Sequence, residues 1–86
     1  MLAREEVKKK MLAEFSGEKL RDARKRKDIT QEELAEKSNT TDRYVRALES
    51  GQKDNPSAAL LCQMSRALDV PMDALMDISE ENPALE

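Results

Sequence analysis

A capping box running from Thr30 to Glu33 is the local signal that most constrains the fold of this chain. In a capping box the Thr hydroxyl accepts a hydrogen bond from the Glu amide, and the Glu carboxylate accepts one from the Thr amide. The box therefore predicts the start of a short helix, over about residues 31–38. Asn39 follows, and Asn tolerates positive φ better than most residues, so a tight turn is expected there.

A second short helix is predicted directly after this turn. Thr41 is a favourable N-cap residue, and Gly51 is typical of the position where a helix ends. Between them Val45 and Leu48 stand three residues apart, a spacing that places both side chains on one helical face. These signals predict a helix over residues 42–50. Two short helices joined by about three residues form a helix-turn-helix arrangement.

Caps elsewhere in the chain predict further helices. Ser16 is a favourable N-cap residue, and Asn55 followed by Pro56 is a cap with proline at the first helical position. Asp28 can end a helix in the left-handed conformation, although less readily than Gly. The helices predicted from these signals cover about residues 17–27 and 56–68, followed by a short one that starts at Pro71.

The two ends of the chain differ in character. Val7, Met11 and Phe15 recur at steps of four, which predicts an amphipathic helix over residues 1–15. The C-terminal residues are acidic and carry no apolar stripe, so they are expected to fray. The predicted organisation is an N-terminal helix, a helical domain and an acidic tail, at residues 1–15, 16–78 and 79–86.

The composition favours an all-α fold. Aromatic residues make up 2% of the 86 residues, so the core must be built from aliphatic side chains and Met. With Gly 2 and Pro 3, the chain has little of the turn chemistry that hairpins need. A chain of this length forms one domain.

The chemistry available to the chain excludes most enzymes. There is no His, which removes His general-base catalysis and Ser–His–Asp triads. Cys62 is the only cysteine and lies in an apolar helical stripe, where a small buried side chain is expected. Asp69, Asp73 and Asp77 recur at steps of four, but Pro71 interrupts the helix between the first two. We therefore expect no enzyme activity, no cofactor and no metal site.

The location expected from the sequence is the cytoplasm. A lone cysteine cannot form an intramolecular disulfide, and no apolar run approaches the length of a membrane span. The first ten residues carry charges where an export signal needs an apolar stretch.

Positive charge is concentrated in the first part of the chain. The net charge is −3, but residues 54–86 contain one base, Arg66, and seven acids. Residues 16–53 contain ten bases and eight acids. A chain with this asymmetry can bind a polyanion on one side only.

Several landmarks of the chain together resemble the lambda-repressor-like family, also called the Cro/repressor or xenobiotic-response-element type of helix-turn-helix. The landmarks are an Arg in the helix predicted over residues 17–27, the T-Q-E-E-L-A segment, an apolar pair before E-x-G, and N-P followed by L, M, A-L and V at matching spacings. They span about residues 17–77. The resemblance implies a compact five-helix bundle that binds duplex DNA, usually as a dimer.

The same resemblance implies which residues contact DNA. Gln31 would contact the phosphate backbone, or else be a plain exposed residue of a first helical turn. Lys53 would donate to phosphate from the loop after the recognition helix. The other positions implied lie on the recognition helix, residues 42–50, and at its cap: Thr41, Asp42, Arg43, Tyr44, Arg46 and Ala47. In this family an Arg in the first helix of the domain forms an ion pair with a Glu near the end of the recognition helix. The matching residues here are Arg24 and Glu49.

Side-chain chemistry suggests a role for each contact. Arg43 can bind guanine O6 and N7 with two hydrogen bonds, and Ala47 can contact a thymine methyl. Asp42 could accept from cytosine N4 or orient Arg43, and it departs from the family pattern, as do Thr40 and Asp54. Arg46 could contact phosphate, a base or only solvent, and Tyr44 could bond to phosphate or pack on the helix pair. The basic run at residues 24–27 is either a solvated helix end or a direct DNA contact.

Two functions fit this sequence. The first is a sequence-specific transcriptional regulator, a repressor, that binds a palindromic operator as a homodimer. Its dimer surface would be the last helix, with Leu75, Met76 and Ile78, or else the N-terminal stripe. The second is an antitoxin or a protein–protein adaptor that uses the same fold and binds a protein partner. The net acidity and Asp42 favour the second, whereas Gln31 and the basic side chains favour the first.

Overall fold

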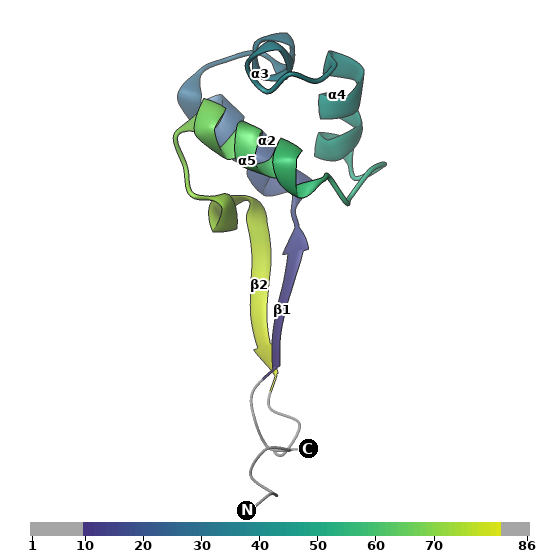
Figure 1. The fold of residues 1–86 in the computed structure, drawn as a ribbon, viewed down its shortest axis with the longest axis vertical. Helices are drawn as coiled ribbons and strands as arrows, with labels where there is room; N and C mark the ends of the chain where they lie inside the picture. Colours follow the sequence, from purple (N-terminus) through teal and green to yellow (C-terminus); the bar gives the residue numbers. More distant parts are fainter. Residues whose placement is uncertain (1–9, 82–86) are drawn as a thin grey trace, which may run out of the picture.

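The computed structural model describes residues 10–81, which form a helical body and a projecting two-stranded ribbon (Figure 1). The body contains four α-helices and one 3-10 helix: α2 (Gly17–Lys27), α3 (Gln31–Lys37), α4 (Asp42–Ser50), α5 (Ala58–Leu68) and η1 (Met72–Leu75). The ribbon pairs β1 (Lys10–Phe15) with β2 (Met76–Glu81) in antiparallel register. The mainly helical fold is confirmed, whereas the predicted fifth α-helix is a single 3-10 turn.

The predicted caps of the two central helices are confirmed. The Thr30 hydroxyl accepts from the Glu33 amide at 3.0 Å, and the Glu33 carboxylate accepts from the Thr30 amide at 2.8 Å. Thr41 caps α4, and Asn39 adopts a φ of 59° in the turn that precedes it. Asp28, Asp69 and Gly51 all end their helices with positive φ. Local backbone chemistry therefore sets the path of the chain through residues 28–51.

The predictions for the two ends of the domain were wrong. Residues 10–15 form β1 rather than the end of a helix, and the start of the acidic tail forms β2 rather than a frayed end. The rest of the predicted N-terminal helix lies outside the described residues. In the ribbon, Phe15 pairs with Met76 and Ala13 with Ile78, so a period of two replaces the four-residue stripe. Pairing between the two ends of the chain overrides the local pattern, and the fold is not all-α.

The predicted start of α5 was also wrong. The helix begins at Ala58, and its N-cap is Ser57, whose hydroxyl accepts from the Leu60 amide at 3.1 Å. Ser is as good a cap as Asn, so the chain has two candidate starts two residues apart. Asn55 and Pro56 remain in the loop after α4.

The core lies between the helices and is made of aliphatic side chains and Met. Leu75 is completely buried in it, which rules out Leu75 as a dimer contact. Phe15 packs against the core from the base of the ribbon, so the ribbon is anchored to the body at that end. The remaining buried apolar residues are Leu20, Ala23, Leu34, Ala35, Val45, Leu48, Met64 and Leu68.

Gly17, the first residue of α2, lies directly against the C-terminal half of α4. A Cβ atom added at Gly17 would lie 2.0 Å from the Leu48 carbonyl oxygen and 3.1 Å from that of Glu49. Both neighbours are backbone atoms and cannot rotate away. The sequence indicated Gly17 only as a helix start, because a close approach between distant segments leaves no local signal.

We predict that Gly17→Ala lowers the free energy of unfolding by about 3 kcal/mol, the upper part of the range for overpacking, because the new methyl meets backbone. Thermal unfolding followed by circular dichroism should show a melting temperature lower by roughly 12 °C or more. Asp22→Ala, at an exposed position of the same helix, is the control and should change stability by less than about 0.5 kcal/mol. Equal melting temperatures for the two variants would contradict the close approach.

Candidate nucleic-acid interface

The first turn of α4 is held at the surface by its cap and by its buried face. Thr41 accepts from the Tyr44 amide at 3.1 Å, which fixes where the helix begins. Val45 and Leu48 are completely buried and dock the helix on the body. Arg43 consequently points outward, and its side chain is exposed.

A buried ion pair joins the first and third helices of the body. Arg24 Nε lies 2.7 Å from one oxygen of Glu49, and Arg24 Nη2 lies 3.1 Å from the other. The side chains are only 12% and 3% exposed. Arg24 Nη1 also donates to the Ile29 carbonyl at 2.9 Å. The structure thus brings together the two residues that the resemblance pairs.

The hydrogen bond to Glu49 raises the pKa of Arg24, although burial of the guanidinium acts in the opposite direction. A raised pKa means that the stabilising contribution of Arg24 is fully present below its unfolded pKa and is lost only as the pH rises through the folded value. Because that value lies above the ordinary pKa of arginine, Arg24 keeps its positive charge throughout the pH range in which proteins are normally studied.

Gln31 connects this ion pair to the surface. Its Nε2 donates to Glu49 at 2.9 Å, and its Oε1 accepts from Arg46 Nε at 3.0 Å. The side chain is half-buried rather than projecting freely as an exposed residue of a first turn. Gln31 therefore links α3 to α4 through side-chain contacts at both ends of its amide.

Arg46 is surrounded by acceptors. Besides Gln31, its Nη2 lies 3.2 Å from Glu32 and 3.5 Å from Asp42. The partner of Asp42 is thus Arg46, and the structure does not show Asp42 orienting Arg43. Sequence reasoning missed Glu32; the only available signals were its position next to Gln31 and the i,i+4 spacing of Asp42 and Arg46.

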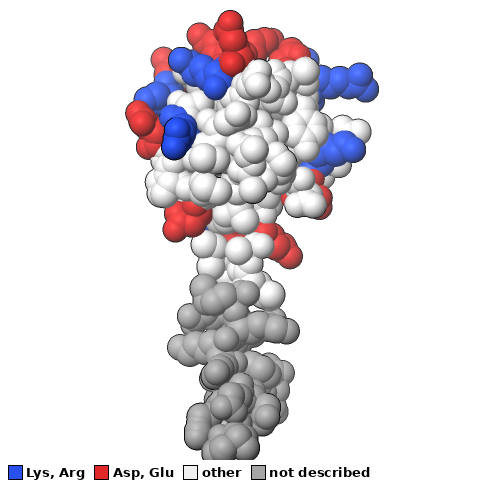
Figure 2. Space-filling view, in the orientation of Figure 1, with Lys and Arg blue, Asp and Glu red and all other residues white. Residues whose placement is uncertain are grey.

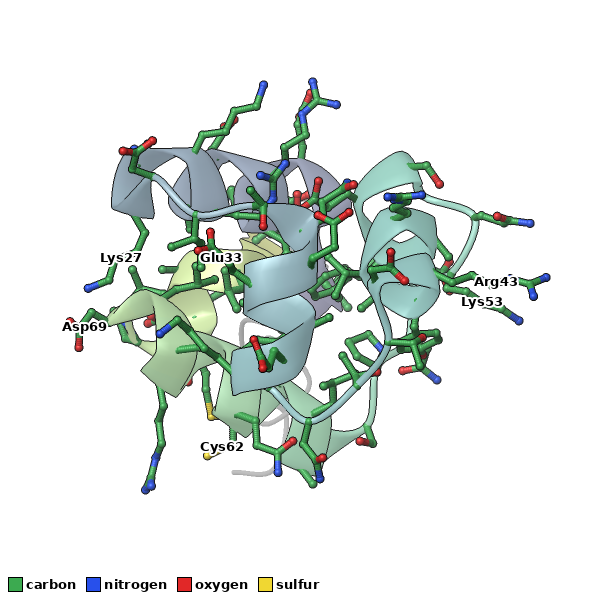
Figure 3. All side chains as sticks on the ribbon, turned by 90° about the horizontal axis from the view of Figure 1, so that it is seen from above. Lys27, Glu33, Arg43, Lys53, Cys62 and Asp69 are labelled. Atoms are coloured by element: carbon green, nitrogen blue, oxygen red, sulfur yellow. The ribbon has the colours of Figure 1, made fainter. Side chains whose placement is uncertain are left out.

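On the other side of α4, two basic side chains project together. Arg43 and Lys53 point away from the body in the same direction (Figure 3). Within residues 10–81 neither forms an ion pair with another side chain. They share a shallow pocket whose further lining residues are Thr41, Tyr44, Ala47 and Gln52. Tyr44 is half-buried and packs against the core, which agrees with the packing role predicted for it as the alternative to a phosphate contact.

A second depression lies between α2 and the junction of α3 with α4. Arg21, Lys25 and Arg46 line it, together with the buried ion pair, Gln31 and Ser50. Lys27 ends the basic run of residues 24–27 and lies away from this depression. Its Nζ is 3.0 Å from Asp69 Oδ2, on the opposite side of the body from Arg43 (Figure 3). The run of residues 24–27 therefore divides, and only its first part faces the α3–α4 junction.

Figure 2 shows Lys and Arg side chains on both flanks of the helical body, with a group of Asp and Glu side chains at the top. We call Arg43 with Lys53 the loop-side pair, and Arg21 with Lys25 the α2-side pair. Arg43 of the loop-side pair belongs to the first turn of α4, whereas the α2-side pair borders Arg46 and Ser50 in the second half of that helix.

The described residues offer little for other chemistry. Cys62 is half-buried. Within residues 10–81, no group of three or more His, Cys, Asp or Glu residues is placed to hold a metal ion. The same part of the chain has no helix with the length and apolar character needed to cross a membrane.

The geometry defines a helix-turn-helix domain: two short helices joined by a tight turn, the second of which exposes Arg43 in its first turn. A helix-turn-helix family model matches residues 20–75. The chain belongs to this family, and its resemblance to the lambda-repressor-like proteins is confirmed. The family is one of transcription regulators, which is not an enzyme class.

Relatives of known role resemble the chain over most of its length. The HTH-type transcriptional regulator SinR of Bacillus subtilis is 34% identical over 65 residues, which are 76% of this chain and 59% of SinR. The structure of SinR in complex with DNA has a TM-score of 0.66 and 34% identity, covering 69% of this chain and 97% of that one. The structure of the restriction-modification controller protein C.AhdI of Aeromonas hydrophila has a TM-score of 0.65 and 36% identity, and the match covers 69% of this chain and 84% of that one.

We predict that Arg24→Met lowers the free energy of unfolding by roughly 3–5 kcal/mol, because it leaves the Glu49 carboxylate buried without its cation. Replacing both partners, as Arg24→Met with Glu49→Leu, should restore most of that loss. Urea denaturation measures both values. The control is Lys27→Met, which removes an exposed ion pair and should cost less than about 1 kcal/mol. A double variant as unstable as the sum of its single substitutions would contradict this account of the pair.

Proposed function

We propose that this chain is a sequence-specific regulator of transcription, a repressor, that reads the major groove of duplex DNA with α4. The observation that carries the proposal is the exposed first turn of α4, where Arg43 projects together with Lys53, while the α2-side pair borders the second half of the helix. A recognition helix presents its first residues to base edges, while flanking groups contact the phosphate backbone on either side. The structure of SinR with DNA supports the proposal, since it is 34% identical to this chain and the match covers 69% of this chain.

The contacts follow from the chemistry of the exposed side chains. Arg43 would bind guanine through two hydrogen bonds, and Thr41 and Ala47 would contact neighbouring bases. Lys53 would bind phosphate on the loop side. Gln31 would donate its second amide hydrogen to phosphate from the other side.

The buried contacts are proposed to be structural. The Arg24–Glu49 pair lies beneath the α3–α4 junction and holds α2 against α4. Asp42 is occupied by Arg46, so we assign it no base. Tyr44 contributes packing.

We propose that the regulator binds a palindromic operator as a homodimer in the cytoplasm. One domain offers few base contacts, and a two-fold dimer doubles them with recognition helices about 34 Å apart. Of the C-terminal residues predicted to form the dimer surface, Ile78 on β2 is 46% exposed and Met76 is half-buried. Leu12 on β1 is 40% exposed, so both strands of the ribbon offer apolar surface.

The exposed ribbon also favours the alternative, an antitoxin or adaptor that binds a protein partner. The two functions separate in one experiment: selection of bound duplexes from random DNA, followed by a salt titration of the selected duplex. A regulator enriches a two-fold symmetric sequence, and its affinity falls steeply with salt. A chain that enriches no sequence and shows no salt-dependent binding is not a DNA-binding regulator.

We predict that Arg43→Ala and Lys53→Ala weaken binding in different ways. Loss of Arg43 should reduce affinity for the selected duplex by roughly 1–3 kcal/mol and relax the preference at one base pair. Loss of Lys53 should weaken binding to all duplexes about equally. It should also reduce the slope of log affinity against log salt concentration by about one. Fluorescence anisotropy across single-base variants of the duplex measures both. Lys27→Ala, which lies on the opposite side, should bind as the parent does; equal losses for all three variants would contradict the proposed interface.

A further inference from the structure

The guanidinium group of Arg46 is held by three acceptors from two helices. Its Nε donates to the Gln31 carbonyl oxygen at 3.0 Å, and its Nη2 donates to Glu32 at 3.2 Å. The same Nη2 lies 3.5 Å from Asp42, one turn before it on α4. A residue placed beside the proposed recognition surface is therefore already bound to two carboxylates.

The position of Gln31 fixes the side from which Arg46 is held. An ionised Glu49 carboxylate can only accept hydrogen bonds, so the amide nitrogen of Gln31 must face it. The carbonyl oxygen of Gln31 then faces away from the ion pair and toward Arg46. The buried pair thus orients Gln31, and Gln31 orients one edge of the Arg46 guanidinium.

The carboxylate contacts of Arg46 lie in water. The side chains of Arg46, Glu32 and Asp42 are 55%, 61% and 43% exposed. Ion pairs in such surroundings are weak, typically about 0–1 kcal/mol each. A DNA phosphate is the same kind of acceptor for a guanidinium as a carboxylate is, so it can replace Glu32 as the partner of Arg46.

We propose that Glu32, assisted by Asp42, competes with DNA phosphate for the guanidinium of Arg46 and so lowers the affinity of the protein for duplex of any sequence. This inference rests on the proposed DNA-binding function and names a residue that regulates it. Binding DNA through Arg46 requires the Glu32 contact to break, and it brings the released carboxylate close to the phosphates. Affinity for a particular duplex must then come from contacts such as that of Arg43, which has no acidic partner within the described residues.

A double-mutant cycle tests the competition. On a random-sequence duplex at low salt, Glu32→Gln should raise the association constant roughly two- to fivefold, the size expected for one exposed pair. In an Arg46→Gln background the same change should have a much smaller effect, because no guanidinium is left to release. Arg46→Gln alone should reduce the slope of log association constant against log salt concentration by about one, because one phosphate contact is lost.

The matched control is Glu36→Gln, which makes the same charge change on the same helix at an exposed position. It should give equal, small effects in both backgrounds. A Glu32→Gln gain that is the same with and without Arg46 would show that Glu32 acts only through general repulsion, and would overturn the competition. An affinity that Glu32→Gln leaves unchanged would overturn it as well.

A measurement without DNA separates this inference from the proposed function. In the free protein, Glu32→Gln should shift the Arg46 Nε–H signal in a nitrogen-15 spectrum, whereas Glu36→Gln should not. An Arg46 signal that neither change moves would overturn the internal contact and leave DNA binding unaffected. Failure of the parent protein to bind any duplex at low salt would instead overturn the proposed function, and the competition with it.

Discussion

The ion pair of Arg24 and Glu49 is the contact on which the arrangement of the proposed interface depends. It is almost completely removed from water, it joins α2 to α4, and its carboxylate also receives Gln31 from α3. Three helices therefore meet at one acidic side chain. Because a buried charge without its partner is strongly unfavourable, the pair restricts how these helices can pack. The exposed side chains of α4 owe their direction to this arrangement below them.

The pair acts together with a close contact between backbones. Gly17 allows the start of α2 to approach the Leu48 and Glu49 carbonyl groups, which belong to the same end of α4 that carries the ion pair. Polar and steric constraints thus act on one end of the helix, and its other end, with Arg43, is left at the surface. The base of the interface is held by buried contacts, whereas Arg46 at its outer edge contacts exposed acceptors.

Much of the helical body could be predicted from the sequence, because its determinants are local. The capping box at Thr30, the cap at Thr41 and the left-handed Asn39 each depend on a few neighbouring residues. The ribbon could not be predicted, since it pairs residues from opposite ends of the chain and neither strand is stable alone. The contacts of Arg46 with Gln31 and Glu32 were missed for a related reason: they join side chains of two helices, and their geometry follows from the packing rather than from spacing.

The first turn of α4 is, on this view, the part of the molecule that meets the bases. A titration of nitrogen-15-labelled protein with its selected duplex tests this claim most directly, by comparing backbone amide signals of the free and bound states. We expect the largest shifts over residues 41–47, with further shifts at Gln31 and Lys53, and little change along α5. Large shifts confined to α5 or to the ribbon, with residues 41–47 unmoved, would contradict the claim.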